Sequence, residues 1–258
     1  MNLEVESAGT GPDLVLLHSL LAERSAFDRV KPELAKSFRV HLVSLPGYGK
    51  SLSQNESTID GYADRVSQFV FTLKNPFVLG NGFGGFIAVA LAIRHGAKLG
   101  ALIAAPALAA FPAQAKEPFR ILAAKVREGG MAAVLDAAIA RMLPPQFGAA
   151  HPEIVAERKR ALAAADPQSF ARACEALARV DFSPQLKYIA CKTLVMAGTL
   201  DQTTPAALAQ ELAAAIPGAQ FRSLSGCGHC PQIEQPSEFA AAIGEFLAAT
   251  RMKEEKSI

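Results

Sequence analysis

Residues 76–91 read Pro-Phe-Val-Leu-Gly-Asn-Gly-Phe-Gly-Gly-Phe-Ile-Ala-Val-Ala-Leu. The apolar residues 77–79 predict a buried strand, and the apolar run after residue 85 predicts a helix. The glycine-rich turn between them has the form of G-x-S-x-G, a sharp strand-to-helix turn that exposes a nucleophile. Residue 82, the nucleophile position, is glycine. The stretch therefore predicts this strand-to-helix turn, called a nucleophile elbow, without the serine oxygen that would attack.

On both sides of this turn, short apolar runs alternate with helical patterns. Strands are expected at residues 3–6, 14–17, 38–43, 77–79, 99–104, 193–197 and 220–224. Helices are expected at residues 25–36, 58–73, 84–95, 205–215 and 236–248. This alternation predicts an α/β fold, with a mostly parallel, twisted sheet covered by helices on both faces.

The alternation stops in the middle of the chain. Ala-rich amphipathic helices are expected there at residues 118–128, 131–143, 152–164 and 167–180, separated by prolines. The predicted organisation is an α/β core formed by residues 1–110 and 184–258, with an all-helical cap inserted at residues 111–183.

The amino-acid composition excludes several classes of protein. The 258 residues are 50% hydrophobic and 19% charged, enough for a sizeable core in one large domain. A net charge of +2 gives no support to a nucleic-acid-binding surface. The first residues lack a basic, apolar targeting segment, and no apolar run is long enough to span a bilayer. A cytoplasmic protein with a small-molecule ligand and no membrane or nucleic-acid partner is expected; its oligomeric state is not predicted.

The four cysteines are expected to be free thiols. Cys227 and Cys230 have C-x-x-C spacing around His229, which allows metal or redox use. A zinc site would need a second pair of ligands, and the sequence offers no matching Cys or His pair. We therefore expect no metal and no cofactor, with both cysteines simply lining a tight loop.

Three positions follow the ends of predicted strands: Gly82, Asp201 and His229. In an open α/β sheet, the site forms at the carboxyl ends of the strands. Alone, Asp201 could cap a turn and His229 could be an ordinary loop residue. Together they follow the order nucleophile, acid, histidine, which favours a catalytic constellation.

These residues resemble the α/β-hydrolase superfamily over nearly the whole chain. The matching segments are residues 16–18, 46–51, 80–85, 198–201 and 228–229. The helical cap and the pair Ser19-Leu20 after the first buried strand look most like the 3-oxoadipate enol-lactonase and small-esterase branch. The resemblance implies a hydrolase, an esterase or lactonase acting on a small apolar ester, lactone or related carbonyl compound.

The resemblance also implies residue roles. His229 would act as general base and then general acid, and Asp201 would hold its imidazole in the required tautomer. The backbone N–H groups of Leu20 and Phe83 would form the oxyanion hole. These two N–H groups belong to the backbone, so they do not depend on a side chain at residue 82.

Glycine at residue 82 leaves several hypotheses open. The serine could have been lost by engineering or naturally, with His229 activating a water in its place. Another side chain could attack, either Ser19 beside the oxyanion loop or a thiol of Cys227 or Cys230. The alternative is a non-catalytic small-molecule binding protein on the same scaffold.

Overall fold

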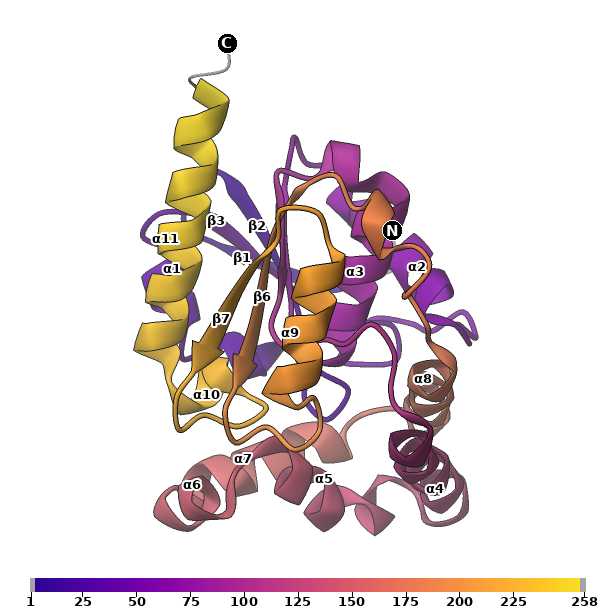
Figure 1. Cartoon of the computed structure of the whole chain (residues 1–258). Coiled ribbons are helices and arrows are strands. Elements are labelled where there is room, and N and C mark those ends of the chain that lie inside the picture. The colour runs from indigo at the N-terminus through magenta and orange to yellow at the C-terminus, as the bar shows by residue number, and fades with distance from the viewer. Residues whose placement is uncertain (1–2, 256–258) are drawn as a thin grey trace.

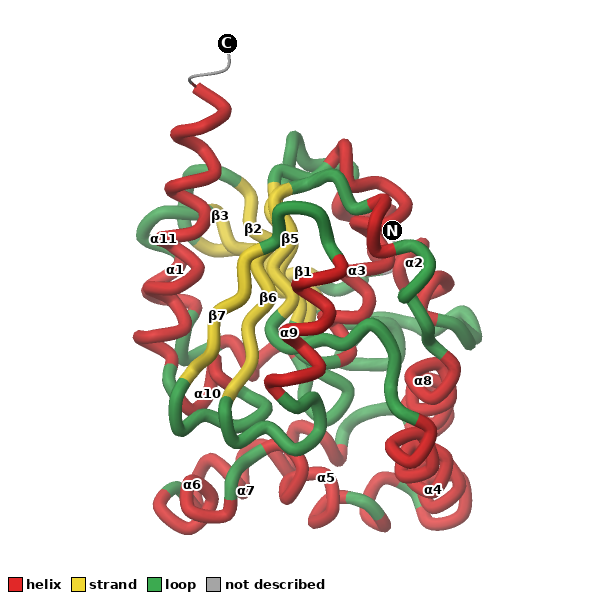
Figure 2. Tube along the Cα trace, viewed as in Figure 1, coloured by secondary structure: helices red, strands yellow, loops and turns green. Residues whose placement is uncertain are grey.

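The computed structural model describes residues 3–255, with side chains for residues 3–252. Within that range the chain forms a seven-stranded sheet in the order β1-β3-β2-β4-β5-β6-β7 (Figures 1 and 2). The strands are β1 (Val5–Ala8), β2 (Asp13–Leu17), β3 (Arg39–Val43), β4 (Phe77–Gly80), β5 (Ala101–Ala104), β6 (Lys192–Gly198) and β7 (Gln220–Leu224). Strand β1 runs antiparallel to β3, and the other neighbours are parallel. The predicted α/β class is confirmed.

Helices cover both faces of the sheet (Figure 1). One face carries α1 (Lys31–Leu34) and α11 (Pro236–Glu255), and the other carries α2 (Ile59–Val70), α3 (Phe83–His95) and α9 (Ala206–Ala215). The residues of β2 are continuously apolar because both faces of the strand are buried. Leu14 and Leu16 pack with one core cluster, and Val15 and Leu17 pack with the other. A strand buried on both faces has no polar side.

The middle of the chain is helical, and its helices lie across the carboxyl ends of the strands (Figure 1). Its helices are α4 (Ala113–Gly129), α5 (Leu135–Met142), α6 (Pro145–Ala150), α7 (Pro152–Ala163) and α8 (Pro167–Arg179). Short 3₁₀ turns occur at Arg24–Phe27, Gly96–Lys98, Met131–Ala133 and Leu186–Tyr188. The division at residues 111 and 183 stays a prediction.

Proline explains where the helices differ from expectation. The helix expected at residues 25–36 is a 3₁₀ turn followed by the short α1, which has Pro32 in its first turn. Helices α6 and α10 (Pro231–Glu234) were not expected, and each has proline as its first residue. Proline is favoured at a helix start because its missing N–H would be unpaired there anyway. None of the described helices is long and apolar enough to cross a membrane.

Candidate functional site

The glycine-rich turn has the geometry of the predicted elbow. Strand β4 ends at Gly80, and α3 begins at Phe83. Between them Gly82 has φ +52° and ψ −118°. Glycine adopts this positive φ without a Cβ penalty, whereas another residue would store strain there. The turn therefore holds residue 82 at the carboxyl edge of the sheet.

The structure brings His229 and Asp201 to this turn. His229 is buried, and its Nδ1 lies 2.9 Å from Asp201 Oδ2 and 3.1 Å from Thr204 Oγ1. Because the Thr204 hydroxyl donates to Asp201 Oδ2, Nδ1 is the ring nitrogen that carries the proton and donates toward the pair. Nε2 is left as an acceptor. It faces Gly82, since a Cβ built on that glycine would lie 2.8 Å from it.

Asp201 is held as a carboxylate. Its Oδ1 accepts hydrogen bonds from the backbone N–H groups of Thr203, at 2.8 Å, and Thr204, at 2.9 Å. Burial raises the pKa of the Asp201 carboxyl, but His229 and the Thr204 donors outweigh burial, so the pKa lies below its ordinary value. Thr204 was not expected from the sequence; the Asp-x-x-Thr spacing of a turn was its only signal.

Ser19 completes the contacts of His229. Its side chain is buried, and its Oγ lies 3.4 Å from His229 Nε2. The hydroxyl also lies beside Gly82, so that a Cβ on residue 82 would collide with it. Sequence reasoning raised Ser19 only because it precedes Leu20. The structure places it between the base and the elbow.

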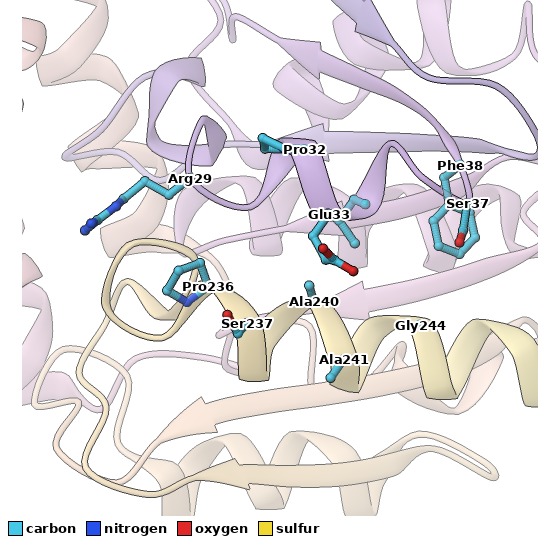
Figure 3. A pocket seen from close by; sticks show the side chains of 11 residues that line it. Arg29, Pro32, Glu33, Ser37, Phe38, Pro236, Ser237, Ala240, Ala241 and Gly244 are labelled. Atoms are coloured by element: carbon cyan, nitrogen blue, oxygen red, sulfur yellow. The ribbon is translucent and has the colours of Figure 1, made fainter.

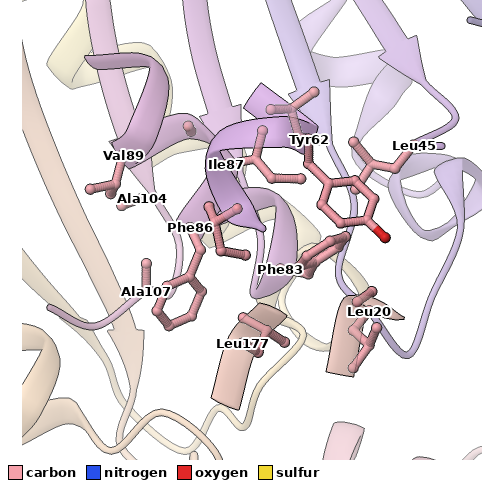
Figure 4. Packing of buried hydrophobic residues seen from close by; sticks show 14 of the residues in the cluster. Leu20, Leu45, Tyr62, Phe83, Phe86, Ile87, Val89, Ala104, Ala107 and Leu177 are labelled. Atoms are coloured by element: carbon pink, nitrogen blue, oxygen red, sulfur yellow. The ribbon is translucent and has the colours of Figure 1, made fainter. Parts of the chain in front are cut away.

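Two residues of the described chain, each with an unpaired backbone donor, line a cavity beside Gly82 and His229. Among residues 3–255, the N–H groups of Leu20 and Phe83 donate no hydrogen bond to another residue. Leu20 is held by the Tyr48 hydroxyl, which donates to its carbonyl at 2.7 Å. Phe83 packs with Leu20, Tyr62 and neighbouring apolar side chains at the start of α3 (Figure 4). The pair can stabilise a developing oxyanion.

His18 anchors the loop that carries Ser19. Its Nδ1–H donates to Ser19 O at 2.9 Å, and its Nε2 accepts from Leu45 N–H at 3.0 Å. The ring is fully buried, and burial lowers the pKa of His18 from 6.5 to about 4. His18 is therefore a neutral positioning residue at physiological pH, not a second base.

This buried neutral ring predicts an acid-dependent loss of stability. The unfolded chain binds a proton at His18 below pH 6.5, whereas the folded chain binds it only near pH 4. The free energy of unfolding should therefore fall as pH drops through this window, by about 3 kcal/mol from this residue. The stability of His18→Asn, which has no titratable group and can keep the hydrogen bond to Ser19 O, should fall less. Urea unfolding of both proteins at about pH 7 and about pH 4 measures the difference; equal losses would contradict the assignment.

Two further residues, missed at the sequence level, hold the loop around His229. Asn81 Nδ2 donates to His229 O at 3.0 Å, linking the elbow to the histidine loop. Glu234 accepts from the N–H groups of Gly228, at 2.7 Å, and Cys230, at 3.0 Å. Asn81 lies inside the elbow motif, so its position was a signal. Nothing in the sequence pattern marked Glu234.

A narrow, mostly apolar cavity opens onto the site. Its lining includes Ser19, Gly82 and His229 together with apolar side chains from the core and the insertion: Leu20, Leu21, Phe83, Phe86, Phe111, Phe119, Leu122 and Leu177. Arg141 of α5 also lines it, and within residues 3–252 its guanidinium forms no ion pair. A more polar hollow shares Arg141, Thr203 and His229 with the cavity and reaches Asp201. Another hollow, between α1 and α11, contains none of the predicted site residues (Figure 3).

The cysteines lie outside this cavity. Cys227 and Cys230 are free, fully buried and absent from its lining. Burial raises the pKa of both thiols, which keeps them protonated. In the described part of the chain, no group of three or more His, Cys, Asp or Glu side chains could hold a metal ion.

Known proteins are similar to this chain in sequence and in fold. Residues 14–242 match the alpha/beta hydrolase family. A pimeloyl-[acyl-carrier protein] methyl ester esterase of Aeromonas hydrophila subsp. hydrophila is 31% identical over 257 residues, 96% of this chain and 100% of that protein. The enol-lactonase of Burkholderia xenovorans is 27% identical, with a TM-score of 0.89 over 95% of this chain and 96% of that chain.

A thermophilic esterase from Thermogutta terrifontis is also similar. It is 28% identical, with a TM-score of 0.88 over 96% of this chain and 93% of that chain. The family match covers the elbow, Asp201 and His229, and the fold matches over nearly the full length. The chain therefore belongs to the alpha/beta hydrolase family, as its sequence resemblance predicted.

Proposed function

We propose that the protein hydrolyses small carboxylic esters or lactones. One observation carries the proposal: Nε2 of His229 is free to accept a proton and faces the elbow, while Nδ1 is held by Asp201 at 2.9 Å. Within the described residues, Leu20 and Phe83 have unpaired N–H groups and line the same cavity as Gly82 and His229. A base, its orienting acid and an oxyanion hole are the groups that acyl transfer to water requires.

Each group has a defined task in this reaction. Nε2 of His229 takes a proton from the attacking hydroxyl, and Asp201 stabilises the imidazolium that results. The Leu20 and Phe83 N–H groups stabilise negative charge on the carbonyl oxygen as the tetrahedral intermediate forms. His229 then returns the proton to the departing alkoxide, which leaves as an alcohol or as the opened end of a lactone.

The cavity and the relatives support the substrate class. The relatives include a methyl ester esterase and an enol-lactonase, both named for reactions at a carboxyl carbon. The apolar lining suits a short hydrocarbon acyl group, since burying each CH₂ contributes about 0.8 kcal/mol. The α4–α8 segment supplies Phe119, Leu122 and Leu177 to that lining. This supports its role as a cap over the site.

Removing the orienting acid tests the proposal. Asp201→Asn should lower kcat for short-chain p-nitrophenyl esters by roughly 10⁴-fold, as the equivalent change does in serine proteases, because the imidazole loses its required tautomer. Asp181→Asn, at an exposed position outside the cavity, is the matched control and should hydrolyse like the parent.

The same assay separates the enzyme from the alternative. A binding protein, favoured only by the missing side chain at residue 82, would gain thermal stability with a ligand but show no turnover. Parent turnover that Asp201→Asn retains in full would contradict the proposed role of the pair. No parent turnover across esters and lactones would remove the hydrolase proposal.

A further inference from the structure

The hydroxyl of Ser19 occupies the space in which a side chain on residue 82 would begin. A Cβ built on Gly82 would collide with Ser19 Oγ and would lie 3.0 Å from Ser19 Cβ. It would also lie 2.8 Å from His229 Nε2. Atoms this close exclude one another, so a side chain on residue 82 would displace the Ser19 hydroxyl. Glycine at residue 82 is therefore what allows that hydroxyl to lie against His229.

We propose that Ser19 is the nucleophile of this site. The inference rests on the proposed hydrolase function and names the residue that attacks. The elbow still supplies the backbone geometry and the Phe83 N–H group, but the hydroxyl arrives from the loop after β2. Residue 82 has no hydroxyl, and the loop after β2 supplies one in its place through Ser19.

The contact between Ser19 and His229 has the required direction. Ser19 Oγ lies 3.4 Å from Nε2, the ring nitrogen that accepts, because Nδ1 is turned to Asp201. This distance is at the long end for a hydrogen bond, as is common for nucleophile and base pairs before substrate binds. The hydroxyl of Thr204, by contrast, is already donated to Asp201. Among the hydroxyl side chains that line the cavity, Ser19 is the one that contacts Nε2 of His229.

The backbone of Ser19 is fixed from two sides. Its carbonyl accepts from His18 Nδ1–H, at 2.9 Å, and from Ala22 N–H, at 3.2 Å. The next residue, Leu20, is held through its own carbonyl by Tyr48. A nucleophile held this rigidly needs little reorganisation before attack. The N–H of Leu20 also directly follows the nucleophile, which is the position that supplies an oxyanion donor at a conventional elbow.

The reaction balances with the residues present and water. Ser19 Oγ forms a bond to the ester carbonyl carbon while its proton passes to His229 Nε2, giving a tetrahedral oxyanion at the Leu20 and Phe83 N–H groups. The bond from that carbon to the alkoxy oxygen breaks, and His229 gives the proton to this departing oxygen, which leaves as the alcohol. Water then attacks the acyl-Ser19 ester, with His229 taking its proton. Collapse returns the proton to Ser19 Oγ and releases the carboxylic acid.

Covalent labelling of the intact chain tests the proposal directly. A fluorophosphonate probe reacts with a serine that a base has activated, and the modified peptide identifies the residue. The expected label is on Ser19, and it should be lost in both Ser19→Ala and His229→Ala. Ser223→Ala, which changes an exposed serine on β7, is the matched control and should label like the parent.

Kinetics of the same variants complete the test. Ser19→Ala should lower kcat for p-nitrophenyl esters by roughly 10⁴- to 10⁶-fold, with an unchanged thermal midpoint that shows a folded protein. The thiol of Ser19→Cys should be alkylated by iodoacetamide, and the reaction should slow when His229 is also replaced. A label on another residue, or full turnover in Ser19→Ala, would overturn the assignment.

The outcomes separate this inference from the proposed function. If Ser19→Ala keeps turnover that Asp201→Asn loses, a water or another group attacks, and the hydrolase proposal stands without Ser19. If the parent turns over no ester or lactone, the hydrolase proposal fails, and His229-dependent labelling still decides whether Ser19 is activated.

Discussion

Placing serine at residue 82 should lower ester turnover, although it recreates the conventional G-x-S-x-G motif. In Gly82→Ser the new Cβ collides with Ser19 Oγ and lies 2.8 Å from His229 Nε2, so both groups must shift. A displacement of about 1 Å in a catalytic group can reduce the rate roughly 10²-fold. The side chain must also adopt φ near +52°, which should destabilise the fold by about 1–3 kcal/mol.

The paired exchange should reverse the loss of activity. Ser19→Gly combined with Gly82→Ser removes the collision and returns one hydroxyl to the space before His229. We expect kcat/KM within about tenfold of the parent, while the strain at residue 82 persists as a lower midpoint in urea. Ser19→Gly alone, which has no hydroxyl at either position, is the control and should be nearly inactive. A large gain of activity in Gly82→Ser alone would show that Ser19 does not occupy the site.

Loss of the base should lower the rate as severely as loss of the nucleophile. His229→Ala removes the acceptor for the Ser19 proton and the donor for the leaving group, and we expect kcat to fall roughly 10⁶-fold. Residues that act as one unit are strongly non-additive. His229→Ala, Ser19→Ala and the double variant should therefore have nearly equal residual rates.

Rates measured by initial velocity with p-nitrophenyl esters check this pattern. A double variant slower than either single variant by the product of their effects would show that the two residues act independently. His229→Gln provides a second variant, because it fills the ring's volume better and guards against local collapse. If it is as active as the parent, His229 is not the base.

Sequence reasoning reached the fold because its signals are local. Continuous apolar runs such as residues 14–17 predict strands covered on both faces, and β2 packs into both core clusters. The order of Gly82, Asp201 and His229 at strand ends predicted which loops meet. The helix expected at residues 25–36 ran through Pro32, which instead lies in the first turn of the short α1. Pro145 was expected to separate helices, and it begins α6.

The contents of the site were less predictable, because they depend on distances between loops. Ser19 and His229 are 210 residues apart, and no periodicity shows that their side chains meet. The hydrogen bonds from Asn81 to His229 O, and from Gly228 and Cys230 to Glu234, likewise depend on the final loop positions. The sequence could show that a hydroxyl was absent from residue 82. Only the three-dimensional arrangement places another one beside it.

The crowding between Ser19 and residue 82 also makes this arrangement hard to reverse during evolution. Once the Ser19 hydroxyl lies against His229, a single mutation that restores serine at residue 82 meets both a collision and a positive φ. Such a mutant is penalised before any compensating change can follow. A chain with glycine at residue 82 and serine at residue 19 is therefore expected to keep both residues. Homologues that keep serine at residue 82 are expected to turn the side chain of residue 19 away from the histidine, or to carry a smaller residue there.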